Sequence, residues 1–152
     1  MTRTSVNWGL IGPGKIAEKF ARDISLVPNA ALVSVPSSDP KRARSFAERC
    51  KVPRAAESYF QILNDPEIAA VHIATIHPNH YNIAKDASIA EKPVLIEKPM
   101  TINAAQAKAL VSLSRTSSAS AKSHLPLREI TTLRANFELL LLSRAETFWV
   151  LV

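Results

Sequence analysis

All three glycines of this 152-residue chain, Gly9, Gly12 and Gly14, lie close together near the N-terminus. Average usage of about 7% would scatter roughly ten glycines along this length. They occur where an apolar run, Val6–Ile11, gives way to a helical pattern, and residues 12–17 read Gly-Pro-Gly-Lys-Ile-Ala. We therefore expect the backbone of this loop to approach another group closely.

A G-x-G-x-x-A pattern between a strand and a helix suits a phosphate. Residues without a Cβ let the main chain come near, and the N–H groups of the following helix face the anion with the positive end of the helix dipole behind them. The pattern predicts a dinucleotide site, and a plain tight turn between strand and helix is the alternative.

The first 114 residues alternate short β-type runs with helical patterns, which is typical of βαβ units and a doubly wound parallel α/β sheet. Strands are expected at 6–11, 31–35, 54–56, 68–75 and 94–96, and helices at about 15–25, 40–50, 58–64, 78–90 and 104–114. The first helix should bury Ile16, Phe20 and Ile24.

Three of these helices carry capping signals. Asp39 precedes Pro40, Ser58 is followed three residues on by Gln61 in a capping-box spacing, and Asn103 is followed by Gln106.

Length and composition indicate one soluble domain. The net charge of +6 is spread along helical patterns among carboxylates, so solvated surface charge is favoured and nucleic acid is not expected as a partner. No apolar run reaches the roughly 20 residues of a membrane helix, and no signal-peptide layout opens the chain. The single cysteine, Cys50, fits a reducing compartment, and we expect a cytoplasmic protein.

The four histidines do not form a metal-ligand set. His77 and His80 share one loop, but one distant cysteine does not complete a zinc site. His72 lies inside an apolar run and is interpreted as a packed core residue. We expect no metal.

The pattern changes after residue 114. Residues 115–123 are rich in serine without a strand pattern, and the chain then runs through Leu139–Leu142 to an apolar end at 148–152 with no evident partner to bury it. Residues 115–152 are therefore set apart from a domain at 1–114.

Four segments together resemble a known family. They are the glycine loop, the serines at 37–38, Thr-Ile-His-Pro-Asn-His at 75–80 and Ile-Glu-Lys-Pro-Met at 96–100. The chain resembles the N-terminal half of the glucose-fructose oxidoreductase and inositol dehydrogenase family (Gfo/Idh/MocA). Its variant of the 75–80 segment is most similar to the branch of dimeric dihydrodiol dehydrogenase and NADP-dependent D-xylose dehydrogenase.

The resemblance implies a Rossmann domain and a role for each matching residue. Lys98 is implied as the catalytic residue, beside the reacting carbon of a sugar or cyclic trans-diol whose hydroxyl is oxidised by hydride transfer to the nicotinamide. The implied cofactor-binding residues are Gly9, Gly12, Pro13, Gly14, Lys15 and Ile16 at the pyrophosphate, Ser37, Ser38 and Arg42 near the ribose, and Thr75, His77, Pro78, His80, Glu97 and Lys98 on the nicotinamide side.

The end of the second strand bears on the choice of cofactor. An enzyme that prefers NAD usually has Asp or Glu there, whereas this chain has Ser37 and Ser38 with Lys41 and Arg42 nearby. Asp39 is better explained as a helix cap. NADP is therefore favoured, with NAD as the alternative.

The family's C-terminal α+β domain, which supplies the substrate pocket, has no counterpart in this sequence. Two explanations are open: a truncated or frame-shifted chain beyond about Arg115, or a separate nucleotide-binding module. We accordingly expect a weak or inactive dehydrogenase, with a non-catalytic NADP(H)-binding module or a non-functional remnant as the alternatives. Oligomers of the family use the missing half, so a homo-oligomer has no support in this chain.

Overall fold

The computed structural model describes residues 5–121 and 150–151, with side chains described as far as Arg115. One sheet with the strand order β3-β2-β1-β4-β5-β6 organises this part of the chain. Its strands are β1 (Val6–Ile11), β2 (Ala30–Pro36), β3 (Arg54–Ala56), β4 (Ala70–Ile73), β5 (Val94–Ile96) and β6 (Val150–Leu151). The first five are parallel, and β6 pairs antiparallel with β5. The doubly wound Rossmann architecture predicted from the sequence is thereby confirmed.

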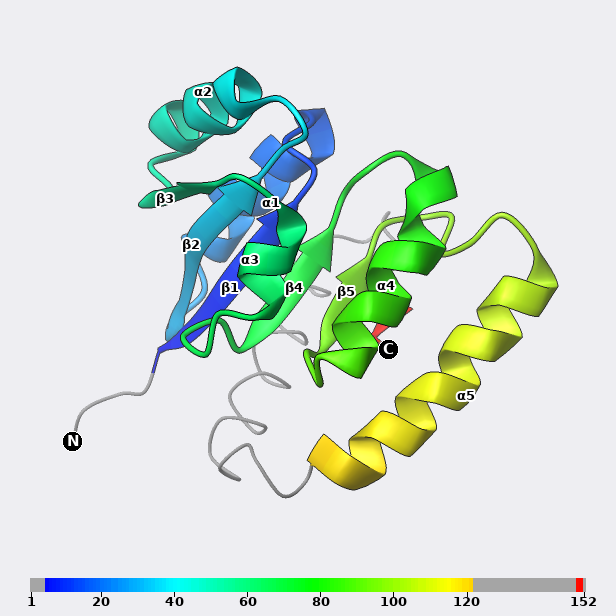
Figure 1. Ribbon diagram of the computed structural model, residues 1–152. Helices are drawn as coiled ribbons and strands as arrows, with labels where there is room; N and C mark the ends of the chain where they lie inside the picture. Colours follow the sequence, from blue (N-terminus) through cyan, green and yellow to red (C-terminus); the bar gives the residue numbers. More distant parts are fainter. Residues whose placement is uncertain (1–4, 122–149, 152) are drawn as a thin grey trace.

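Helices cover both faces of the sheet. They are α1 (Lys15–Ile24), α2 (Pro40–Cys50), α3 (Tyr59–Leu63), α4 (His80–Ile89) and α5 (Ala104–Ala121), with a 3-10 turn η1 (His77–Asn79) before α4. Figure 1 shows α3 and α4 in front of the sheet, α1 behind it, and α5 beside α4.

The core divides into two layers because successive strand residues point to opposite faces. Trp8 and Leu10 of β1, both fully buried, pack with Phe20 of α1 and Phe46 of α2. Ile11 and Ile73 belong to the other cluster, with residues of α3, α4 and α5. The two layers fix the strands, and thereby the loops at their carboxyl ends.

The buried face of α1 differs from the expected one at its first turn. Phe20 and Ile24 are buried as predicted, but Ile16 is 48% exposed and the fully buried Ala17 takes its place. The buried residues of α1 are Ala17, Phe20, Ala21 and Ile24, an i, i+3, i+4, i+7 spacing that leaves Ile16 beside the apolar stripe.

Two of the three expected caps are confirmed. The Asp39 carboxylate accepts from the Lys41 N–H at 2.9 Å, and Asn103 Oδ1 accepts from the Gln106 N–H at 2.9 Å. The capping box at Ser58 is wrong: the Ser58 side chain makes no capping bond, and Gln61 Oε1 accepts from the Glu57 N–H instead. With Ser58 extended and α3 only five residues long, the glutamine reaches one residue further back.

Several boundaries also differ. β4 is shorter than the expected 68–75, and α4 begins at His80 because η1 occupies the preceding residues. α5 continues beyond Ser114 to Ala121, since no Gly or Pro interrupts it.

Val150 and Leu151 form β6 on the edge of β5, so this part of the apolar end does have a partner. Leu139–Leu142 and Phe148–Trp149 lie outside the described residues.

Candidate functional site

At Gly12 the loop after β1 packs closely against the loop after β4. Its φ is +101°, and a Cβ there would lie 2.7 Å from the Thr75 backbone nitrogen and 2.8 Å from the Ala74 carbonyl carbon. The Ala74 N–H donates to the Ile11 carbonyl at 2.8 Å. β1 and β4 are the neighbours at which the strand order reverses, and open parallel sheets bind ligands at that point.

Gly14 leaves the start of α1 open. Among the described residues, no atom outside Gly14, its two chain neighbours and the backbone of its own helix lies within 4 Å of the position its Cβ would take. Gly14 is the N-cap of α1 without a side-chain capping bond, and the first helical bond runs from the Glu18 N–H to its carbonyl. The N–H groups of Lys15, Ile16 and Ala17 precede the first helical donor, Glu18, and therefore have no acceptor within the helix. They leave donors at a positive helix end that an anion can approach.

The other residues predicted for this loop differ in their surroundings. Lys15 and Ile16 are exposed at the first turn of α1, and Pro13 is half-buried between the two glycines. Gly9 lies inside β1, where a Cβ would come within 2.5 Å of Ile62 Cγ2 of α3. Close helix-on-strand packing thus explains Gly9.

His80 ties the loop after β4 to the segment after β5. The ring is buried, with Nε2 2.9 Å from the Thr75 carbonyl oxygen and Nδ1 2.9 Å from the Pro99 carbonyl oxygen. Both partners are acceptors, so the ring donates to both only when both nitrogens carry a proton. His80 therefore contacts backbone on both sides.

Glu97 and Lys98 point into different surroundings. Lys98 is exposed, and the Lys98–Pro99 peptide bond is cis. Glu97 is only 3% exposed, and its Oε1 lies 3.5 Å from Nε2 of the fully buried His72. His72 is a core residue, as expected, but its pairing with Glu97 was not foreseen, because only the strand register places the two side chains on one face of the sheet.

The residues after β2 lie on the surface at the start of α2. Ser37 Oγ accepts from the Asp39 N–H at 3.2 Å, and Ser38 is exposed. Lys41 and Arg42 are exposed and form no ion pair within the described part of the chain. This end of α2 therefore offers hydroxyls and two cations to solvent.

His77 and Pro78 occupy the exposed turn η1, next to Ile76, which is 69% exposed. Between residues 5 and 115, no group of three or more His, Cys, Asp or Glu side chains could hold a metal ion. No helix of the described segments is long and apolar enough to cross a bilayer.

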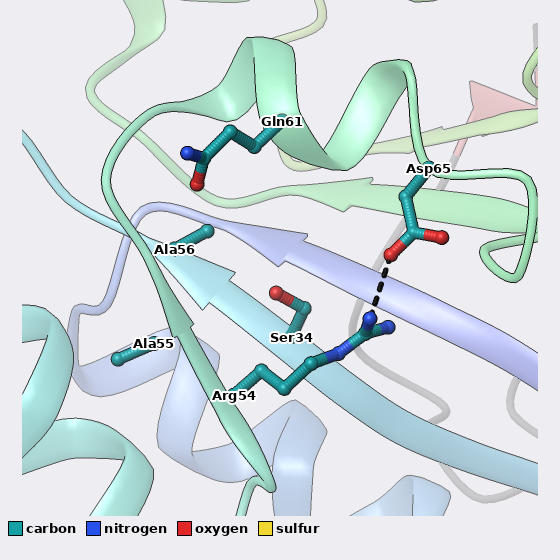
Figure 2. Close-up of a pocket in the computed structure, with 6 residues that line it drawn as sticks. All are labelled: Ser34, Arg54, Ala55, Ala56, Gln61 and Asp65. Atoms are coloured by element: carbon teal, nitrogen blue, oxygen red, sulfur yellow. Dashed lines mark ion pairs between the residues drawn. The ribbon is translucent and has the colours of Figure 1, made fainter.

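A polar cavity of about 410 Å³ lies elsewhere, between α3 and strands β2 and β3. Figure 2 shows Ser34 and Gln61 at this cavity with Arg54, whose guanidinium pairs with Asp65 at 2.9 Å. None of its lining residues belongs to the glycine loop, to the loop after β4 or to the segment after β5. This cavity is therefore not part of the candidate site.

A parallel sheet with this strand order and an open helix end at its switch point defines a dinucleotide-binding domain of the Rossmann type. The chain belongs to the Gfo/Idh/MocA oxidoreductases: residues 6–122 match the family described as "Oxidoreductase family, NAD-binding Rossmann fold". The family resemblance carried by the four sequence segments is thus confirmed.

Individual relatives are consistent with this family assignment. The chain is 35% identical over 113 residues to mouse trans-1,2-dihydrobenzene-1,2-diol dehydrogenase, covering 73% of this chain and 34% of the mouse protein. It is 33% identical to the zebrafish (Danio rerio) enzyme of that name over 115 residues, covering 74% of this chain and 34% of that protein. The chain therefore spans about a third of the length of these curated relatives.

Solved structures share the fold. The 3-ketoreductase KijD10 from Actinomadura kijaniata, in complex with NADP and TDP-benzene, matches with a TM-score of 0.71 and 27% identity over 75% of this chain and 35% of its own. Levoglucosan dehydrogenase, in complex with NADH and levoglucosan, matches with a TM-score of 0.71 and 25% identity over 74% of this chain and 32% of its own.

Proposed function

We propose that this chain binds NADP at the carboxyl edge of its sheet, as the nucleotide-binding part of an enzyme that oxidises a hydroxyl of a sugar or cyclic trans-diol. The observation that carries the proposal is the open N-terminus of α1 at the switch point. Gly12 seats the loop against Ala74 and Thr75, and Gly14 leaves space in front of three N–H donors. These features suit a pyrophosphate.

The preference for NADP rests on the residues after β2. A ribose 2′-phosphate would find the Ser38 hydroxyl and the cations of Lys41 and Arg42, which form no ion pair among the described residues. The Asp39 carboxylate is already engaged as the cap of α2, so it is a poor partner for ribose hydroxyls. Relatives are solved with NADP and with NADH, and NAD stays the alternative cofactor.

Lys98 is the residue that we assign to the chemistry. It follows β5 at the carboxyl edge, is exposed, and carries an ammonium that would favour a developing alkoxide and orient the substrate hydroxyl. A bound nicotinamide supplies the hydride chemistry itself. The substrate class is taken from relatives named for diol and sugar-derived compounds.

Binding of NADP(H) without catalysis is the second candidate. The nucleotide side of the site is supported by the contact of the glycine loop with the loop after β4, whereas the chemistry depends on Lys98 alone.

Fluorescence titration of the purified 152-residue chain with NADPH and with NADH tests the proposal. We expect saturable binding of NADPH, weaker binding of NADH, and loss of both in Gly14→Ala, whose methyl group fills the open space without touching the fold. Ile89→Val is the control, since that side chain is exposed at the end of α4 away from the glycine loop. No saturation with either nucleotide, by protein with a native circular dichroism spectrum, would exclude this function. Turnover of a cyclic trans-diol or D-xylose with NADP, lost in Lys98→Met, separates the enzyme from the binding module.

A further inference from the structure

Two buried histidines hold the segment that carries Lys98, one on each side of it. His72 contacts Glu97, the residue before Lys98, and His80 contacts the carbonyl of Pro99, the residue after it. Neither histidine is more than 1% exposed, so both act from inside the fold. We infer that His72 and His80 are positioning residues that fix Lys98 relative to the loop after β4, and we refer to these two residues with Glu97 as the histidine brace.

The first arm of the brace starts in the core. His72 on β4 packs against Phe20 of α1, with ring centroids 4.1 Å apart, so its ring has little freedom. A buried carboxylate is costly unless a partner compensates it. Neither Glu97 oxygen accepts a hydrogen bond among the described residues, and His72 Nε2, 3.5 Å from Oε1, is the nitrogen that faces it. The Glu97 N–H also donates to the Ile73 carbonyl at 3.0 Å. The backbone of Glu97 is therefore hydrogen-bonded to β4, and its carboxylate faces the His72 ring on the same strand.

The second arm crosses from one loop to the other. His80 begins α4, and its two ring nitrogens reach the Thr75 and Pro99 carbonyl oxygens. Thr75 is the residue whose backbone touches Gly12. The chain of contacts thus runs from the glycine loop through Thr75 and His80 to Pro99.

The histidine brace matters for catalysis only if the proposed function holds, and the inference rests on it in that respect. Positioning contributes to rate only if the reacting groups are held in fixed geometry. Lys98 is exposed and has no ion pair among the described residues, so its place depends on the backbone that carries it. The family resemblance implies that His80 contacts the nicotinamide. In the structure its ring instead lies between two backbone carbonyls, which is a different role.

Backbone ¹⁵N order parameters of the full chain test the brace without requiring nucleotide. In the wild type we expect the Lys98 and Met100 amides near the rigid value of about 0.85. In His80→Phe, which replaces the imidazole with a phenyl ring that has no nitrogen, we expect them below about 0.6, with β1 unchanged. His80→Gln, whose amide nitrogen has two donors, should restore most of the rigidity. Asn79→Ala is the matched control, since that exposed side chain makes no capping bond.

Glu97→Gln tests the first arm, because it keeps the shape and removes the charge that His72 faces. We expect hydrogen exchange at the residue 97 amide to accelerate roughly 5-fold, because the side chain loses its electrostatic attraction to the His72 ring. If His80→Phe does not fold, Glu97→Gln still tests the inference. Unchanged order parameters in His80→Phe and unchanged exchange in Glu97→Gln would overturn the inference, as would Lys98 being mobile in the wild type.

Failure of the brace and failure of the proposed function are distinguishable. If the wild type does not bind NADPH but the brace variants loosen residues 98–100, the proposed function is wrong and the structural role of the histidines stands. If NADPH binds and the variants leave residues 98–100 rigid, the nucleotide site stands and the brace is wrong.

Discussion

A Cβ atom on Gly12 would lie 2.7 Å from the backbone nitrogen of Thr75, so the loop after β1 and the loop after β4 are in direct backbone contact. Real Cβ atoms do not approach backbone this closely, and neither loop can withdraw without breaking strand pairing, since the neighbouring Ala74 N–H bonds to Ile11. Gly12 is therefore required for the fold, whereas Gly14 is free to serve a ligand.

Gly12→Ala should destabilise the domain by about 2 to 4 kcal/mol, because it combines a positive φ with a backbone clash. Gly14→Ala should cost less, about 0.5 to 1 kcal/mol, because the space is open and φ is −110° but alanine is a poorer N-cap than glycine. Urea denaturation of both variants measures the difference. Equal losses of stability in the two would show that the loop does not pack as described.

Gly9→Ala should cost about 1 to 3 kcal/mol by overpacking β1 against α3. The new methyl group would clash with Ile62 Cγ2, so the same substitution should cost less in an Ile62→Ala background. A double-mutant cycle by urea denaturation measures this coupling. Additive losses would place the strain somewhere other than Ile62.

Asp39→Ala should lower stability by about 1 kcal/mol through loss of the helix cap, and Asp39→Asn should retain most of it. Neither change should weaken NADPH binding, because the Asp39 side chain is occupied by the Lys41 N–H. Arg42→Ala should instead weaken NADPH and leave NADH unaffected. Weaker NADH binding by Asp39→Asn would argue that Asp39 holds the ribose hydroxyls after all.

Stability should fall above pH 10 through Tyr59. Burial and the hydrogen bond to Asp86, 2.8 Å away, raise the pKa of the Tyr59 phenol to about 12 from its ordinary value of 10.0. The folded state holds this proton more tightly than the unfolded state, so the contribution is complete below pH 10 and is lost as pH rises from 10 towards 12.

Urea midpoints at pH 9 and pH 11 check this expectation as a difference between variants. Tyr59→Phe should be less stable than the wild type at pH 9 and should lose less on going to pH 11. Tyr81→Phe, which alters the other tyrosine, should keep the wild-type loss. A pH response of Tyr59→Phe equal to that of the wild type would exclude Tyr59 as its source.

The sequence alone determined the local features and the fold class. The clustered glycines, the alternation of short apolar runs with helical patterns and the caps at Asp39 and Asn103 are local signals, each readable within a few residues. The capping box at Ser58, the buried role of Ile16 and the end of α5 were predicted wrongly. In each case the geometry of a helix end decided the outcome, and propensity constrains helix ends weakly.

Only the tertiary structure decided what the glycines and histidines do. Gly9 and Gly12 are separated by two residues, yet one packs against a helix and the other against a neighbouring loop. His72 and Glu97 become partners only through the pairing of β4 with β5. His80 reaches two carbonyls that are distant from each other in sequence. Such contacts depend on strand register and on how helices seat against the sheet, and no pattern within a single segment carries that information.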